Sequence, residues 1–258
     1  MLKSFDLNGR VAIVTGATGY LGSAMSAGLA EAGCRVVVTG RDGAEARKQA
    51  ARLPGAGHLG LALDLENEAD IDLLVRTTES QMGRIDALVN NAYRDPPEGL
   101  SVAESFAAAF RFGVTGPYLL AEKVIQHLLR RGSPGSIVNI GSIYGVGSNY
   151  PREYEGLPVA SPAYYHALKG AVINLSRYLA VQYATRGIRV NTVSPGCYLN
   201  DRLLREMPEF CERFLQEIPM GRLGKPEELK GMIVYLASDA STYTTGQNIL
   251  VDGGWTAW

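Results

Sequence analysis

The sequence predicts an α/β fold: a doubly wound parallel sheet of about seven strands, with helices on both faces, in a single domain. Short runs rich in valine and isoleucine alternate with longer stretches of helical periodicity, which is typical of βαβ units. A glycine-rich turn follows the first of these runs directly. The 258 residues, 46% of them hydrophobic, are enough for one core, and no linker-like segment divides them.

Seven apolar runs are expected as buried strands, because they are short and rich in β-branched residues. They cover residues 11–14, 35–39, 59–63, 87–90, 136–140, 189–193 and 248–251. Helices are expected at residues 21–32, 66–82, 102–130, 163–186 and 226–238. A sheet wound in this way binds its ligand at the carboxyl ends of the strands, so functional residues are expected in the segments that follow the strands.

Composition limits the possible partners. The net charge is -1 and both signs are scattered, so neither a nucleic-acid surface nor an acidic tail is expected. Cys34, Cys197 and Cys211 lie far apart and the three histidines form no cluster, which predicts reduced thiols and no metal site. Residues 1–10 mix charges ahead of a short apolar run, so we expect no signal peptide, no membrane segment and a cytoplasmic location.

The first strand is followed by a turn with glycines at three positions, Gly16, Gly19 and Gly22. Such a turn lets backbone N–H groups approach a pyrophosphate, and the start of the next helix favours negative charge. The glycines could also serve only to shape the chain. At the end of the second strand, Arg41 suits the 2′-phosphate of NADP, whereas the neighbouring Asp42 could itself bind a ribose. The pair favours NADP over NAD.

A tyrosine and a lysine lie one helical turn apart at Tyr165 and Lys169. Residues four apart share a helix face, and a fixed positive charge lowers the pKa of a nearby phenol toward the range useful for proton transfer. A pair at this spacing is more often only part of a solvated helix face. The motifs elsewhere in the chain favour the catalytic interpretation.

Over nearly its whole length the chain resembles the short-chain dehydrogenases/reductases of the compact, one-domain, Rossmann-like kind. The resemblance rests on the glycine turn 15–22, Asp64-Leu65, Asn90-Asn91-Ala92, Ser142, Tyr165 with Lys169, Pro195-Gly196, Gly246-Gln247-Asn248 and Asp252-Gly253-Gly254. It implies that Ser142, Tyr165 and Lys169 are catalytic: Tyr165 exchanges a proton with the substrate oxygen, Ser142 holds that oxygen, and Lys169 also holds the nicotinamide ribose.

The same resemblance implies the residues that line the cofactor. In the glycine turn these are Gly16, Thr18, Gly19, Tyr20, Leu21 and Gly22, together with Arg41, Tyr165 and Lys169. Asp64 and Leu65 would border the adenine, Asn91 and Ala92 would lie along the cofactor, and Pro195, Gly196 and Tyr198 would lie beside the nicotinamide.

Several residues depart from the family pattern. Tyr20 and Tyr93 stand where glycines are usual, and Asn200 stands where a threonine is common. Gly113 stands where members commonly carry an asparagine that anchors a proton-relay water. Because glycine has no side chain, another group must serve or protons must exchange by another route.

Ser142 and Tyr165 are separated by about twice the usual distance, so an active-site insert is expected at about residues 147–161. With Tyr93, Arg94, Tyr144, Tyr150 and Tyr154 it is expected to form a polar, aromatic wall for a hydroxylated, sugar- or polyol-like substrate. The alternative is a surface loop that shields the sheet or contacts a neighbouring subunit.

Residues 199–217 are expected to form a lid whose leucines and phenylalanines cover the substrate, while Arg202, Arg205 and Arg213 face water or an anion. Trp255 and Trp258 suggest a subunit interface, and the resemblance implies a homotetramer. The predicted function is hydride transfer between a nicotinamide cofactor and a secondary alcohol or ketone. A nucleotide-sensing protein on the same fold, which binds the cofactor without turnover, is the alternative.

Overall fold

The computed structural model describes residues 2–157 and 159–258, so Pro158 of the predicted insert lies outside the described residues. Its sheet is parallel throughout, with strand order β3-β2-β1-β4-β5-β6-β7. The strands are β1 (Val11–Val14), β2 (Arg35–Gly40), β3 (Leu59–Ala62), β4 (Ala87–Asn90), β5 (Gly135–Ile140), β6 (Ile188–Pro195) and β7 (Asn248–Val251). The strand order reverses between β1 and β4, which is where sheets of this kind bind ligands. The predicted doubly wound α/β fold is confirmed.

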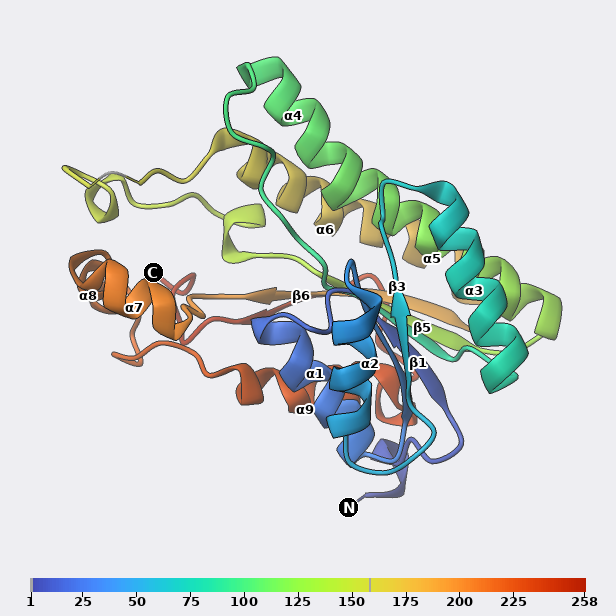
Figure 1. Cartoon of the computed structure of the whole chain (residues 1–258). Helices are drawn as coiled ribbons and strands as arrows, with labels where there is room; N and C mark the ends of the chain where they lie inside the picture. The colour runs from blue at the N-terminus through green and yellow to red at the C-terminus, as the bar shows by residue number, and fades with distance from the viewer. Residues whose placement is uncertain (1, 158) are drawn as a thin grey trace.

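Helices cover both faces of the sheet (Figure 1). On one face lie α1 (Tyr20–Glu31), α2 (Gly43–Arg52) and α9 (Lys230–Ala237), and on the other α3 (Glu68–Met82), α4 (Val102–Phe110), α5 (Gly116–Arg131) and α6 (Ala163–Tyr183). Each layer has its own buried apolar cluster, because the strands are apolar on both faces. Helix α2 was not among the predicted helices.

The helix expected at residues 102–130 is interrupted by a π-helical turn, Arg111–Thr115, that lies between α4 and α5. Gly113 lies inside this turn. A Cβ at Gly116, the first residue of α5, would lie 2.3 Å from the carbonyl oxygen of Leu65, so the helix starts in direct contact with the segment after β3. Turns of this type occur mostly as single bulges near functional sites.

A third apolar cluster joins the two segments that lie beyond the end of the sheet. It contains side chains of the insert, of α7 (Asp201–Glu206) and α8 (Pro208–Gln216) or their flanks, and of the C-terminal segment. The insert, which includes a 3-10 turn at Pro151–Glu153, lies beside α8 in Figure 1. The predicted insert and lid therefore pack against each other, and we call them together the cap (residues 147–161 and 199–217).

Two arginines hold the cap together. Arg152 of the insert donates two hydrogen bonds to the Glu217 carboxylate, at 2.7 and 2.6 Å. Arg213 of α8 donates to the backbone oxygens of Arg152 and Glu155, at 3.0 and 2.6 Å. Arg213 was expected to face water or an anion: one of its nitrogens does pair with a carboxylate, that of Glu209 at 2.7 Å, whereas the other bonds insert carbonyls that lack helix or sheet partners.

The two C-terminal tryptophans differ in environment. Trp255 is 2% exposed and packs on Tyr144 and Tyr150, with ring centroids 5.8 and 5.1 Å away. The expectation that Trp255 forms a subunit interface is therefore wrong, since its ring is buried within its own chain. Trp258 is 70% exposed, and its role in an interface stays a prediction.

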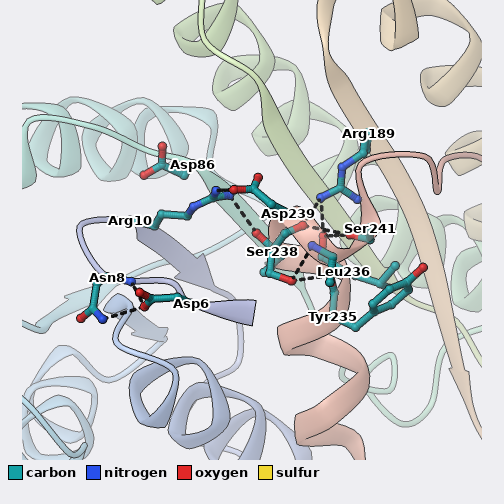
Figure 2. Close-up of polar contacts among 12 residues, drawn as sticks. Asp6, Asn8, Arg10, Asp86, Arg189, Tyr235, Leu236, Ser238, Asp239 and Ser241 are labelled. Carbon is teal, nitrogen blue, oxygen red and sulfur yellow. Dashed lines mark hydrogen bonds and ion pairs between the residues drawn. The ribbon is translucent and has the colours of Figure 1, made fainter. Parts of the chain in front are cut away.

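At the opposite, amino edge of the sheet, two arginines connect β1 and β6 to the segment after α9 (Figure 2). Arg10 donates to Asp239 at 2.5 Å, and Arg189 donates to the backbone oxygens of Leu236 and Ser238, at 2.7 and 3.2 Å. A cavity of about 570 Å³ opens beside them. Both guanidinium groups have protein partners, so this edge serves to fasten the last helix to the sheet.

Among the described residues, no helix combines the length and the apolar character that crossing a membrane requires.

Candidate active site

The three glycines of the first turn have different roles. Gly16 has φ +62, and a Cβ there would lie 2.8 Å from the Cα of Ala92. A Cβ at Gly22 would lie 2.2 Å from the Gly16 oxygen. These two positions require glycine because backbone segments meet there, as the chain-shaping alternative expects. A Cβ at Gly19 would meet only the Gly16 oxygen, at 3.3 Å, so the third glycine leaves the turn open toward the cleft.

Helix α1 starts at this open position without a side-chain cap. Its N-cap is Gly19, which contributes no side-chain hydrogen bond, so the first N–H groups of the helix point at the cleft without a side-chain partner. This arrangement suits a phosphate group. The fit of the turn to a dinucleotide therefore rests on Gly19 and the helix start.

A cavity of about 560 Å³ runs along the carboxyl ends of β1, β2 and β4. Its lining includes these predicted cofactor residues: Gly16, Thr18, Gly19, Tyr20, Leu21, Gly22, Arg41, Leu65, Asn91 and Ala92. The structure thus gathers residues from four separate segments around one cleft.

Thr15 was missed by the sequence reasoning, although it organises the turn. Its hydroxyl oxygen accepts from the backbone N–H groups of Asn91 and Ala92, at 2.9 and 3.0 Å. The Asn91 side chain donates in return to the backbone oxygens of Thr15 and Gly16, at 2.9 and 3.2 Å. The Asn91 amide therefore holds the glycine turn in shape. The signal available in the sequence was a hydroxyl side chain placed between the first apolar run and Gly16.

Arg41 and Asp42, the two residues that could each bind the adenosine end of a cofactor, make different contacts. The Asp42 carboxylate accepts from the backbone N–H groups of Ala44 and Glu45, at 2.7 and 3.2 Å, and caps α2. Those bonds, that of Glu45 first, lower the pKa of Asp42. Arg41 instead lines the cleft. Because the carboxylate is committed to the helix cap, Arg41 is the ionic group facing this end of the cleft.

Lys169 is buried next to the sheet. Its ammonium donates to the backbone oxygen of Ile140 at 2.8 Å, and the residue is 6% exposed. Desolvation lowers the pKa of Lys169 to about 8. The nitrogen lies 5.5 Å from the ring centre of Tyr93 and 5.7 Å from that of Tyr165. The pair predicted from the sequence does share one side of α6.

Tyr165 lies between two other tyrosines. Its ring meets Tyr93 edge to face at 5.0 Å and Tyr144 at 6.3 Å. Burial raises the pKa of Tyr165, the hydrogen bond with Ser142 opposes that rise, and the Asp95 charge adds to it. The expected lowering by Lys169 is wrong for this structure, because burial dominates and the ammonium is bonded to Ile140. The phenol is held in its protonated form.

Ser142 follows β5 and is 7% exposed. Its hydroxyl oxygen accepts from the backbone N–H of Tyr144 at 3.1 Å, which keeps the hydroxyl proton free to donate. Ser142, Tyr165 and Lys169 are thus brought together at the carboxyl edge of the sheet.

A small cavity of about 20 Å³ lies beneath Tyr93, with Asn90, Gly113, Asn139 and Lys169 in its lining. This volume is enough for one water molecule. The side-chain oxygen of Asn90 is buried there without a hydrogen-bond partner among the described residues. Gly113 thus lines the same small cavity as Asn90 and Lys169, although a Cβ at Gly113 would meet the Leu168 side chain at 3.2 Å.

The remaining predicted cofactor residues, Asp64, Pro195, Gly196 and Tyr198, are not among the residues that line the cleft along the carboxyl ends of β1, β2 and β4. Asp64 accepts from the backbone N–H of Glu66 at 3.0 Å and serves the local turn. A Cβ at Gly196 would lie 2.6 Å from the Cα of Asp252, so Pro195-Gly196 runs tightly beside the segment after β7. Tyr198 lies against Gly224, and burial raises the pKa of Tyr198 to about 12.

Two side chains connect the cleft with the start of the lid. The Tyr20 hydroxyl donates to the Leu199 oxygen at 3.2 Å. Asn200 lines the cleft, and its side-chain oxygen accepts from the Leu203 N–H at 3.0 Å, which caps α7. The first residues of the lid therefore border the predicted cofactor site.

The predicted substrate residues fall into two groups. Arg94 belongs to the cofactor cleft, which it lines, and not to the group of tyrosines in and beside the cap. It forms an ion pair with Glu66, and its guanidinium lies 4.9 Å from the ring centre of Phe112. Tyr93 lines the same cleft and reaches Tyr165.

Tyr150 and Tyr154 of the cap gather with Tyr144, which follows β5, in one apolar cluster. The hydroxyls of Tyr144 and Tyr154 lie 2.7 Å apart, and the Tyr144 ring stacks on His166 at 4.6 Å. Tyr154 packs on Phe210 of α8 at 5.4 Å. The cap thus forms an aromatic layer that starts beside Tyr165.

Comparison with known proteins gives whole-chain matches. A family model described as enoyl-(acyl carrier protein) reductase matches residues 16–256. The 2-dehydro-3-deoxy-D-gluconate 5-dehydrogenase of Dickeya dadantii is 33% identical, and the match covers 100% of this chain and 99% of that protein. Among solved structures, a short-chain type dehydrogenase/reductase from Mycobacterium marinum matches with TM-score 0.86 and 30% identity, covering 100% of this chain and 99% of that one. A gluconate 5-dehydrogenase from Burkholderia cenocepacia, in complex with NADP and tartrate, matches with TM-score 0.85 and 31% identity at the same coverage.

Proposed function

The chain belongs to the short-chain dehydrogenase/reductase family and is a nicotinamide-dependent oxidoreductase of alcohols or ketones, and from that premise we propose that it prefers NADP and acts on a sugar acid or a related polyhydroxylated compound. The observation that carries the proposal is the convergence of Ser142, Tyr165 and Lys169 beside a cleft whose far end presents Arg41.

The cofactor preference is supported by the different contacts of Arg41 and Asp42 at the end of β2. Asp42 is committed to the cap of α2, and Arg41 is left to meet a 2′-phosphate. The first N–H groups of α1 would hold the pyrophosphate. Leu65 and Ala92 would border the cofactor along its length. The NADP bound to the similar gluconate 5-dehydrogenase structure points the same way.

The substrate class is supported by the cap. The phenols of Tyr144 and Tyr154 supply hydrogen-bonding groups on aromatic rings next to Tyr165, which suits a ligand with several hydroxyls. The similar proteins named for gluconate and 2-dehydro-3-deoxy-D-gluconate act on compounds of that kind. We assign the insert 147–161 and the lid 199–217 to the substrate site on this ground.

The chemistry follows from the side chains. A bound nicotinamide would supply hydride to a carbonyl carbon, or accept it from an alcohol carbon in the reverse direction. Tyr165, kept protonated by burial, donates its proton to the substrate oxygen in the reduction. Ser142 donates a hydrogen bond to the same oxygen, whose charge grows during the reaction.

Lys169 holds its charge near the reacting phenol and would contact the nicotinamide ribose. In the oxidation its positive charge, 5.7 Å from the ring centre of Tyr165, favours the phenolate that Tyr165 must form, although burial keeps the pKa of the phenol raised. The cavity shared by Asn90 and Lys169 offers a route by which a water can return the proton to solvent in place of the missing side chain at Gly113. The cap excludes bulk water from the same space.

The test is a panel of sugar acids, sugars, polyols and keto acids, assayed in both directions with NADP(H) and NAD(H). We expect turnover with a polyhydroxylated member, faster with the phosphorylated cofactor. Tyr165→Phe should abolish that turnover and change the dissociation constant of the cofactor by no more than a few-fold, because only the phenolic hydroxyl is removed. A phenylalanine variant that kept more than a tenth of wild-type turnover would contradict the role of Tyr165.

A nucleotide sensor remains the second candidate, favoured by the single observation that Gly113 removes the usual relay side chain. It would bind the cofactor and turn over no member of the panel.

We also propose that the chain forms a homotetramer. The exposed Trp258, and Tyr178 and Val181 on the outer side of α6, supply apolar surface for subunit contacts. Sedimentation equilibrium tests this directly, and a monomer at micromolar concentration would contradict it.

A further inference from the structure

Glu153 is a fully buried carboxyl group in the insert. Its residue is 0% exposed, and neither of its side-chain oxygens has a hydrogen-bond partner among the described residues. In the part of the chain that the structure describes, both nearby arginines are engaged elsewhere: the adjacent Arg152 is paired with Glu217, and Arg213 bonds backbone oxygens and Glu209. A charged carboxylate in such a place costs several kcal/mol, so the group is held as the neutral acid.

The groups around Glu153 come from every element that packs on it. They are Tyr144 after β5, Tyr150 and Tyr154 of the insert itself, Cys197 after β6, Glu217 at the end of the lid and Trp255 near the C-terminus. Burial raises the pKa of Glu153 to about 7, and the Glu217 carboxylate adds to the rise. The backbone at Tyr150 and the side chains of Trp255 and Tyr144 oppose it.

Trp255, which packs near Glu153, also buries a polar group that lacks a hydrogen-bond partner in the described part of the chain. Its indole N–H is buried without a hydrogen-bond partner among the described residues. The indole N–H and the Glu153 carboxyl group thus lie close together in one apolar cluster, and the indole opposes the rise that burial causes in the pKa of Glu153. Nothing in the glycine turn or the cofactor cleft takes part in this contact.

The cluster reaches the reacting groups through Tyr144. The Tyr144 ring meets Tyr165 at 6.3 Å and Trp255 at 5.8 Å, and its hydroxyl lies 2.7 Å from that of Tyr154. A shift of Glu153 therefore moves the side chain that stands beside the catalytic phenol.

We propose that Glu153 is a positioning residue for the substrate site: as an uncharged acid it holds Tyr144 and Trp255 together and thereby fixes the aromatic wall next to Tyr165. The inference rests on the proposed function in one respect, since it takes the insert as part of the substrate site.

A pH dependence follows from this role. Glu153 contributes fully to the packing of the insert below pH 4.5, the ordinary pKa of a glutamic acid, because the carboxyl group is then neutral whether or not the insert is packed. This contribution to the packing free energy falls as the pH rises to about 7, the pKa of Glu153 in the packed insert. Above that pH no further loss is expected from Glu153. His166, whose ring stacks on Tyr144, is a second titratable group next to this ring, and burial lowers its pKa.

Trp255 gives a direct readout in a variant that lacks the other tryptophan. In Trp258→Phe, we expect the Trp255 emission to change with a midpoint near pH 7, and Glu153→Gln in that background to remove the transition. Glu155→Gln, which neutralises an exposed carboxylate of the same insert, is the matched control and should leave it unchanged. A transition that persists in Glu153→Gln would belong to His166 and overturn the proposal.

Kinetics at saturating cofactor provide the second readout. The wild-type KM for the best substrate should rise by about tenfold or more between pH 5 and pH 7 and then level off. Glu153→Gln should keep the low KM throughout, because an amide donates and accepts as the neutral acid does, whereas Glu153→Ala should show a raised KM at every pH with little change in kcat.

Wild-type KM values in Glu153→Ala, or an unaltered pH profile in Glu153→Gln, would overturn the proposal. Failure of the proposed function gives a different result: the fluorescence transition of Trp255 would remain, and the wild-type protein would turn over no substrate with either cofactor.

Discussion

Replacing Arg41 with alanine should separate the two nicotinamide cofactors. Arg41 lines the cleft at the end of β2, and its neighbour Asp42 is occupied by the cap of α2, so a 2′-phosphate has this guanidinium as its ionic partner there. A hydrogen bond to a charged group contributes about 1.5–3 kcal/mol. Because the arginine is solvent-exposed, the lower end of that range applies, which corresponds to about tenfold in affinity.

The assay is a fluorescence titration of NADPH and of NADH against each protein. We expect Arg41→Ala to weaken NADPH by about tenfold and to leave NADH nearly unchanged. Arg52→Ala removes the same charge at the opposite, exposed end of α2 and serves as the control. Equal losses for both cofactors would refute the reasoning, since they would mean that Arg41 only packs on the adenine and that the site does not select NADP.

Two further predictions address the cap and the buried lysine. Replacing the insert 147–161 by a short glycine-containing turn should raise KM or lower kcat for the best substrate at an unchanged cofactor dissociation constant, whereas unchanged kinetics with an altered size on gel filtration would make the insert a subunit contact. Lys169 has a folded pKa of about 8 against an ordinary 10.5, so the unfolded chain binds more protons between these values. The difference in the free energy of unfolding between wild type and Lys169→Met, measured in urea, should therefore shift in favour of wild type by about 3 kcal/mol from pH 8 to 10.5. A difference that stays constant with pH would contradict the burial of the ammonium.

The strands could be predicted from the sequence because both faces of the sheet are buried. All seven expected runs are strands in the structure: three have the expected bounds, and the ends of the other four differ by one or two residues. The missed helix α2 has a different cause: its apolar positions, Ala46 and Ala50, are small, so the pattern that packs it on the sheet is weak in the sequence.

The residues of the candidate active site could also be located from the sequence, because Ser142, Tyr165 and Lys169 belong to the motifs that carry the family resemblance, and the structure brings the three together. The cap could not. Glu153, Arg213 and Trp255 are far apart in the chain, and each would normally be assigned to the surface or to an interface. Their burial or pairing depends on which segments meet beyond the end of the sheet, and that tertiary information is absent from spacing alone.

The π-helical turn at Arg111–Thr115 bears on which changes of chain length the protein tolerates. Each residue of an α-helix turns the chain by about 100°, so deleting one residue here would regularise the helix and rotate α4 by that angle relative to α5. Phe106 of α4 would lose its ring contact with Tyr164, whose centroid now lies 6.2 Å away. Tyr164 is the neighbour of Tyr165, the proposed proton donor. A change of length in the insert alters only a loop. A change of a single residue at the junction of α4 and α5 would instead rotate α4 and displace its contacts beside the candidate active site.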